Sequence, residues 1–347
     1  MKQTFRLLTL LSMTFFISCN SFGQEKDDYS AKIDSLIQTT NPRSFNGVIL
    51  ITQKGKTKYS KAFGYSNFEK KAPLTTKDNF IIMSNSKQIT AVLTLKEVEK
   101  GKIDLQSPVR KYLPELKQSW ADTVTVHQLL NFSAGITDIE KPLIFKPGTD
   151  FKYGDTSYIM LGKILERVTG RKYSDIANNL FKELKMNNTF CFEQGKTQNR
   201  VQGYYNTNNT FKLIENPIES NEKVSAAGII SNVKDLNIWD IKLHKGKMLK
   251  PETYQLMINY VITAQHNAFG KEKIGYGYGV RVSDKTPVKY VGHTGGGSGF
   301  VSFKVYFPAT DVDIVVLENQ SNKKLDLFYE FEIKIKEIIM NSNLMKK

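Results

Sequence analysis

The chain has 347 residues, of which 40% are hydrophobic and 24% are charged, and its formal net charge is +15. This length and hydrophobic fraction allow a large core and about two domains or lobes, and they exclude a disordered chain. The basic excess indicates either a lysine-rich soluble surface or attraction to an anionic partner, such as a cell-envelope polymer, outer-leaflet lipid or a carboxylate-bearing substrate. Nucleic acid is excluded as a partner, because the lysines are scattered and no helix-turn-helix, RNA-binding or zinc-finger pattern is present.

The first residues predict an export signal. Lys2 and Arg6 precede an apolar run over residues 7–18, and these 12 residues are too few for a membrane-spanning helix, which needs about 20. No later stretch of the sequence is long and apolar enough to span a membrane. We therefore expect an exported bacterial protein of the cell envelope.

Two processing sites compete in this leader. Phe-Ile-Ser-Cys at 16–19 is similar to a bacterial lipoprotein box, which would remove residues 1–18 and leave a lipid on Cys19. Small residues at 21–23 also suit an ordinary signal peptidase, which would remove residues 1–23 and release a periplasmic or secreted protein. We favour the lipid on Cys19, which would be the protein's only link to the membrane, with residues 19–29 as a solvated tether.

Hydrophobic periodicity predicts strands at both ends of the mature chain and helices between them. In chain order we expect a helix at 30–38, a hairpin of strands at 48–51 and 58–63, helices at 87–100, 126–130, 160–168 and 232–239, strands at 299–307 and 311–317, and an amphipathic helix at 325–340.

This order predicts an α+β fold in one domain over residues 30–342. Its antiparallel sheet, of approximately five strands, is expected to form from residues 30–83 and 270–342 and to be flanked by the terminal helices. A mostly helical lobe, residues 84–269, is inserted between these strands. A functional site is expected in a cleft where the two lobes join.

The first chemical motif is Ser-Asn-Ser-Lys at 84–87, which matches the S-x-x-K pattern of serine acyl-transfer enzymes. If Ser84 starts a helix, the positive end of the helix dipole would stabilise a developing alkoxide. The three-residue step would place Lys87 on the same face of the helix. Burial there would lower the pKa of the lysine and allow it to accept a proton.

Further segments match in the same order along the chain. They are Leu-Leu-Asn-Phe-Ser-Ala-Gly-Ile at 129–136, Phe-Lys-Pro-Gly at 145–148 and Ala-Ala-Gly-Ile-Ile-Ser at 226–231. With residues 84–87 they make the chain, from about residue 30 to 340, resemble the family of class C β-lactamases, D-alanyl-D-alanine carboxypeptidases and related serine esterases. The resemblance implies a β-lactamase/transpeptidase-like fold, with Ser84 as the nucleophile and Lys87 as its activator.

The second family motif is Tyr-x-Asn, and here the chain has Tyr-Gly-Asp at 153–155. By resemblance, Tyr153 would share proton transfer with Lys87. Asp155 departs from the family, because Asn offers an amide donor to a substrate carbonyl whereas an ionised Asp only accepts hydrogen bonds. A carboxylate would also hold Lys87 charged. Either the mechanism uses these groups differently, or the substrate brings a donor to Asp155.

The third motif is Gly-His-Thr-Gly-Gly-Gly at 292–297, which matches the family's Lys/His-Thr-Gly strand. The resemblance implies that His293 and Thr294 face a substrate carboxylate or carbonyl. Gly295 and Gly296 would permit a close backbone approach, and the N–H groups of Ser84 and Gly296 would form the oxyanion hole.

The resemblance implies an enzyme that forms an acyl-enzyme at Ser84 and takes a small peptide, ester or β-lactam substrate. Within this class we rank a D-alanyl peptide carboxypeptidase or peptidase first and an esterase second. A β-lactamase comes third, because of His293 and Asp155. A non-catalytic penicillin-binding-like protein is the alternative from another class. We expect no cofactor and no metal, because the other histidines lack metal-ligand spacing and no dinucleotide or phosphate-binding loop is present.

Overall fold

A computed structural model describes residues 27–195, 199–264, 269–270, 273–284 and 288–346. The predicted signal peptide, the lipid site Cys19 and most of the predicted tether lie outside these residues. Within them, no helix is both long and apolar enough to cross a membrane.

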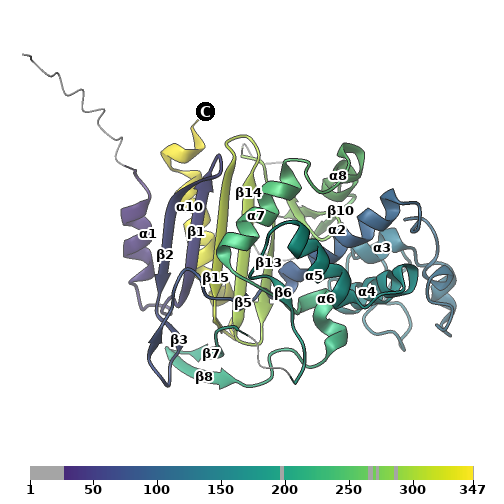
Figure 1. Cartoon of the computed structure of the whole chain (residues 1–347), viewed down its shortest axis with the longest axis horizontal. Helices are drawn as coiled ribbons and strands as arrows, with labels where there is room; N and C mark the ends of the chain where they lie inside the picture. The colour runs from purple at the N-terminus through teal and green to yellow at the C-terminus, as the bar shows by residue number, and fades with distance from the viewer. Residues whose placement is uncertain (1–26, 196–198, 265–268, 271–272, 285–287, 347) are drawn as a thin grey trace, which may run out of the picture.

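The centre of the fold is an eight-stranded antiparallel sheet in the order β10-β11-β12-β13-β14-β15-β1-β2 (Figure 1). The strands are β1 (Gly47–Gln53), β2 (Lys56–Phe63), β10 (Ile262–Ala264), β11 (Ile274–Tyr276), β12 (Arg281–Ser283), β13 (Tyr290–Gly297), β14 (Phe300–Phe307) and β15 (Val312–Glu318). β1 pairs with β15 along its whole length, from Gly47 opposite Glu318 to Gln53 opposite Val312. Strands from the two ends of the chain are therefore hydrogen-bonded neighbours in one sheet.

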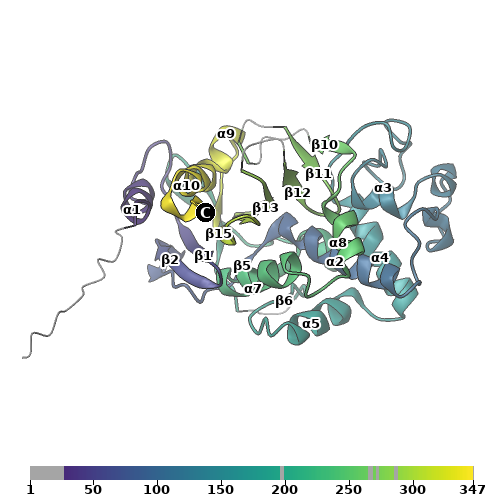
Figure 2. The same cartoon turned by 90° about the horizontal axis from the view of Figure 1, so that it is seen from above.

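Both faces of this sheet are buried, which explains the continuous apolar run Val-Ile-Leu-Ile in β1. In β1, Ile49 and Ile51 pack toward α1 (Ser30–Ile37) and α10 (Glu330–Met340), whereas Val48 and Leu50 pack toward the helical part of the molecule. Figure 2 shows α1 and α10 on one face and α7 (Val233–His244) and α2 (Ser86–Glu99) on the other.

The segment between β2 and β10 is mostly helical. Its helices are η1 (Met83–Asn85), α2, η2 (Val109–Lys111), η3 (Ser119–Asp122), α3 (Val126–Leu130), α4 (Thr156–Thr169), α5 (Tyr173–Glu183), η4 (Asn221–Lys223), α6 (Val224–Ala227), α7 and α8 (Pro251–Ile258). The remaining elements are the short strands β3 (Tyr65–Asn67), β4 (Ala72–Pro73), β5 (Phe80–Ile81), β6 (Phe190–Cys191), β7 (Gly203–Thr207), β8 (Thr210–Ile214), β9 (Ile229–Ser231) and β16 (Gln320–Ser321), and the C-terminal α9 (Leu325–Phe328) and η5 (Asn343–Met345).

The predicted α+β class and antiparallel sheet are confirmed, but the sheet has eight strands rather than about five. β10, β11 and β12 have three residues each, and such short strands show no clear periodicity in sequence. Residues 262–264 also belong to this sheet, although we expected them in the helical lobe. The expected helix at 325–340 is divided at Tyr329 into α9 and α10.

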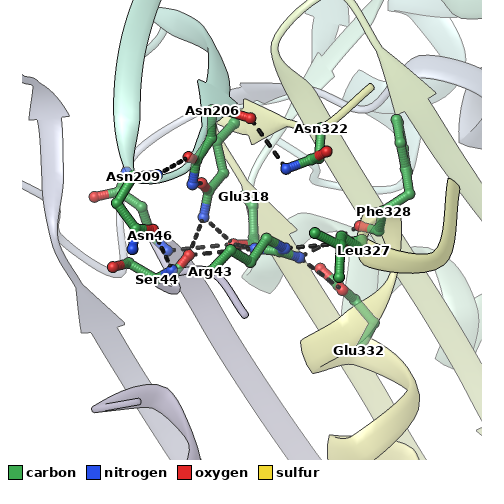
Figure 3. A network of polar contacts seen from close by, with 11 residues as sticks. Arg43, Ser44, Asn46, Asn206, Asn209, Glu318, Asn322, Leu327, Phe328 and Glu332 are labelled. Carbon is green, nitrogen blue, oxygen red and sulfur yellow. Dashed lines mark hydrogen bonds and ion pairs between the residues drawn. The ribbon is translucent and has the colours of Figure 1, made fainter. Parts of the chain in front are cut away.

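A buried ionic network joins the segment before β1, the end of β15 and the α9–α10 junction (Figure 3). Arg43 donates from Nη1 and Nη2 to the two carboxylate oxygens of Glu318, at 2.9 and 2.7 Å. The same guanidinium donates to the backbone carbonyls of Leu327 and Phe328, at 2.8 and 3.3 Å. Glu332 lies 3.7 Å away, and burial together with the nearby Glu318 raises its pKa. One side chain thus fixes the start of the C-terminal helices to the sheet.

We expect Arg43→Met to reduce the free energy of unfolding by about 3–5 kcal/mol, because the variant leaves the carboxylate of Glu318 buried without its counter-charge. Urea denaturation of the wild type and the variant measures the difference. Lys61→Met is the matched control, since it breaks the 2.7 Å pair between Lys61 and Asp34 on the surface. It should cost less than about 1 kcal/mol. Equal losses of unfolding free energy in the two variants would show that the Arg43 network stabilises the protein no more than a surface ion pair does.

Candidate active site

The segment that carries Ser84 is held between a small sheet and the buried helix α2. β5 pairs with β9, and the chain then turns sharply at Met83, whose φ of 49° lies in the left-handed region. Ser84 follows in the single turn η1, directly before α2 begins at Ser86. The serine therefore stands at the N-terminal end of α2, as expected, although it precedes the regular helix. The strained residue before it turns the serine out of the core.

Lys87 is completely buried and its ammonium group meets three acceptors. Nζ donates to Ser84 Oγ at 3.1 Å, to Asp155 Oδ1 at 2.7 Å and to the carbonyl oxygen of Ala226 at 3.0 Å. An ammonium has three N–H donors, so these contacts, together with a hydrogen bond to Tyr153, leave none of them free. The predicted approach of Ser84 and Lys87 is present in the structure, and Asp155 belongs to the same group.

The charges around Lys87 oppose the effect of its burial. Burial alone lowers the pKa of Lys87, but Tyr153 and Asp155 outweigh it, and the pKa lies above its usual value. The ammonium in turn lowers the pKa of Asp155, whose side chain is 43% exposed at the N-terminal end of α4. The resting site therefore contains an ion pair, which agrees with the expectation that a carboxylate at position 155 would hold Lys87 charged and not with the neutral lysine that burial alone would favour.

Tyr153 lies beside this ion pair, two residues before Asp155. The centroid of its ring is 5.1 Å from Lys87 Nζ and 4.6 Å from the ring of Phe132. A hydrogen bond between Tyr153 and Lys87 contributes to the raised pKa of the lysine. The structure thus brings together the three residues that we predicted to be catalytic.

β13 passes so close to Ser84 that one of its positions has no room for a side chain. A Cβ atom on Gly295 would lie 2.8 Å from the backbone nitrogen of Ser84 and 2.3 Å from the carbonyl oxygen of Ile82. A Cβ atom on Gly296 would lie 2.0 Å from the ring of Phe328. The predicted oxyanion donors, the N–H groups of Ser84 and Gly296, therefore belong to two segments in direct contact.

His293 does not face the substrate side, which contradicts our expectation. The ring is fully buried, with Nδ1 2.7 Å from the carbonyl oxygen of Thr294 and Nε2 2.8 Å from the hydroxyl of Tyr276. Because a carbonyl oxygen only accepts, Nδ1 carries the proton and Nε2 accepts from the tyrosine. Burial, followed by the positive charges of Arg281 and Lys87, holds its pKa well below the usual value. A neutral, buried imidazole cannot supply a positive charge to a carboxylate.

Arg281 of β12 supplies a positive charge that the sequence motifs did not reveal. The residue is 2% exposed, and its guanidinium carbon lies 5.7 Å from the ring centroid of Tyr153 and 5.5 Å from that of Tyr276. Its Nε and Nη1 atoms are buried and lack a hydrogen-bond partner among the described residues. An arginine at an inward position of the alternating sequence Val-Arg-Val was the available signal in the sequence.

Tyr329, at the junction of α9 and α10, is a second residue that sequence reasoning missed. Its hydroxyl is hydrogen-bonded to Thr294, and a Cβ atom on Gly296 would lie 3.0 Å from that hydroxyl. Burial raises the pKa of Tyr329, so the phenol stays neutral. The Arg43 network therefore also positions a side chain next to β13.

The described residues contain no group of three or more histidine, cysteine, aspartate or glutamate side chains that could hold a metal ion.

An antiparallel sheet with a Ser-x-x-Lys serine at the start of a buried helix, faced by a Thr-Gly strand, defines the β-lactamase/transpeptidase class of folds. The Beta-lactamase family model matches residues 33–332, and the chain belongs to this family.

Relatives and solved structures agree with this assignment. Protein flp of Staphylococcus aureus (strain MRSA252) is 24% identical over 327 residues, which are 86% of this chain and 64% of that protein. The structure of an octameric penicillin-binding protein homologue from Pyrococcus abyssi superposes with a TM-score of 0.75 and 28% identity, over 84% of this chain and 73% of that one. D-amino acid amidase from Ochrobactrum anthropi SV3 has the same fold, with a TM-score of 0.78 and 20% identity over 90% and 99% of the two chains.

We expect Asp155→Asn to lower the pKa of Lys87, because the buried ammonium loses the negative charge 2.7 Å away. NMR of protein labelled with ¹³C at lysine Cε, with Lys87 assigned through Lys87→Arg, should show the titration at lower pH in the variant. Asp138→Asn removes an exposed carboxylate from the loop before Tyr153 and should leave this titration unchanged. Identical curves for wild type and Asp155→Asn would mean that Asp155 does not set the charge of Lys87.

Proposed function

We propose that this protein is an exported serine hydrolase that forms an acyl-enzyme at Ser84 and acts as a D-alanyl peptide carboxypeptidase or peptidase. The observation that carries the acyl-transfer step is the 3.1 Å contact between Ser84 Oγ and the fully buried Lys87 Nζ, beside the glycine backbone of β13. In the proposed reaction, the Lys87 ammonium first gives a proton to Asp155 across their 2.7 Å contact. The neutral amine, assisted by Tyr153, then accepts the proton of Ser84 Oγ as that oxygen bonds to the carbonyl carbon. That proton then goes to the leaving group, and water releases the acyl product.

The choice of a carboxypeptidase rests on Arg281. A buried cation with unpartnered donors favours an anionic ligand, and a bidentate carboxylate matches the geometry of a guanidinium. His293 is neutral, which leaves Arg281 as the positive charge we assign to a C-terminal carboxylate of the leaving group. The structural likeness to a D-amino acid amidase supports an amide substrate of D configuration.

A cell-envelope location is part of the proposal. It is supported by the leader of residues 1–18 or 1–23 and by the lipoprotein box ending at Cys19. The net charge of +15 would also attract an anionic cell-envelope polymer to the surface of the protein.

The acyl-enzyme is tested with a fluorescent penicillin or a fluorophosphonate probe. We expect covalent labelling of the wild type and none of Ser84→Ala, because the probe reacts with the serine oxygen. Ser298→Gly is the control, since Ser298 lies in a neighbouring Gly-Gly-Ser-Gly turn with a φ of 47° that glycine adopts without strain. It should keep its labelling. A wild type that stays unlabelled under conditions that label a related penicillin-binding protein would overturn the proposal.

The role of Arg281 is tested with D-alanyl-D-alanine and its C-terminal amide. We expect Arg281→Met to reduce kcat/KM for the free carboxylate by about 10- to 100-fold, the range for a lost hydrogen bond to a charged group. The amide should change by less than about threefold, because it has no negative charge to lose. Arg281→Lys keeps the positive charge but loses the planar, bidentate guanidinium. Its loss of kcat/KM on the free carboxylate should therefore lie between the wild-type value and that of Arg281→Met. Equal losses of kcat/KM on both substrates would show that Arg281 only maintains the structure of the site and does not bind the carboxylate.

A further inference from the structure

Asp155 differs from the family's asparagine in what it can bind. The carboxylate only accepts hydrogen bonds, and it has about four lone-pair sites. The bond to Lys87 uses Oδ1, and the side chain remains 43% exposed. The group is therefore a partly open acceptor in the active site, where an asparagine would present both a donor and an acceptor.

The two lysines that lower the pKa of Asp155 do not occupy all of the hydrogen-bond acceptor sites of its carboxylate. Lys87 shares its three donors among Ser84, Ala226, Tyr153 and Asp155 itself. Lys223 of η4 is the other cation that lowers the pKa of Asp155, and it forms its own ion pair with Glu219. The exposed side of the carboxylate can thus accept a further donor from a ligand.

This acceptor lies within reach of an amino group on the reacting acyl residue. Ser84 Oγ and Asp155 Oδ1 bind the same Nζ at 3.1 and 2.7 Å, so their separation is less than the sum of these distances. In an α-amino acyl group the nitrogen lies about 2.5 Å from the carbonyl carbon. A carbonyl placed about 3–3.5 Å from Ser84 Oγ can therefore bring its α-nitrogen to hydrogen-bond distance from Asp155.

We infer that Asp155 binds a free α-ammonium group on the acyl residue of the substrate, so that the site takes substrates with an unblocked amino terminus. The proposed carboxypeptidase would then act on D-alanyl dipeptides, because a longer peptide has no free amino group on its acyl residue. The inference rests on the proposed acyl transfer at Ser84 and specifies its substrate class. An N-acylated residue keeps one amide N–H at this nitrogen but has no charge, so it offers Asp155 a single neutral donor. An ammonium offers three donors and a charge opposite to that of Asp155.

The test compares D-alanine p-nitroanilide with N-acetyl-D-alanine p-nitroanilide. Both release p-nitroaniline, which has no carboxylate for Arg281 to bind. We expect the wild type to prefer the free amine by more than about 10-fold in kcat/KM. Asp155→Asn should reduce this preference by about 10- to 100-fold, the range for a hydrogen bond between charged groups. Because Asp155 also contacts Lys87, any general loss of rate affects both substrates and cancels in their ratio. Asp138→Asn should keep the wild-type ratio.

A pH series on the wild type provides a second measurement that needs no variant. The α-amino group of the substrate has an ordinary pKa near 8. The preference for the free amine should decline above this pH, because the ammonium loses its charge, whereas the rate on the N-acetyl substrate should show no such decline.

Turnover of p-nitrophenyl acetate, which has neither an amino nor a carboxylate group, separates the two proposals. If the ester is hydrolysed in a Ser84-dependent manner but the wild type shows no preference for the free amine, or Asp155→Asn keeps it, the ammonium inference alone is wrong. If neither the ester nor either anilide acylates Ser84, the proposed function is wrong and the inference is wrong with it.

Discussion

The arrangement of the segments around the active site depends on the buried positive charge of Lys87. Lys87 has no exposed surface, and an ammonium in that position is tolerated because three acceptors surround it. The acceptors come from η1, from the start of α4 and from α6. Three segments that are far apart in sequence must therefore meet at a single nitrogen atom, and the position of Ser84 follows from this requirement.

The elements that could be predicted from the sequence are those with a clear hydrophobic periodicity. The hairpin of β1 and β2, the strands β14 and β15, and the helix α2 have periodicities long enough to read, and the structure has them in the expected places. β11 and β12 lie within residues 270–342, which were expected to contribute strands, but their bounds were not predicted because three residues carry no period. β10 was missed, since it lies in the expected helical lobe. Helical periodicity continues through Tyr329, so the break between α9 and α10 was not visible either.

Within the site, motif spacing predicted which residues meet but not their charge states. Ser84, Lys87, Tyr153 and Asp155 come together as expected, since their roles follow from the order of motifs along the chain. His293 was misread because its exposure depends on the packing of Tyr276, which no local pattern reports. Arg281 and Tyr329 stand outside any motif, and their importance appears when β12 and the C-terminal helices are placed beside β13.

The pairing of β1 with β15 has a consequence for how the protein matures. The two strands are separated by more than 250 residues, and β15 is followed by the helices that bring Tyr329 to Thr294. A ribosome makes β15 and Tyr329 well after Ser84 and Lys87, so a partly synthesised chain can contain the serine and lysine while it lacks the strand and tyrosine that complete the site. Long-range pairing of this kind also forms slowly. The site described above is thus assembled only after β13–β15 and the C-terminal helices have been synthesised and have paired with β1.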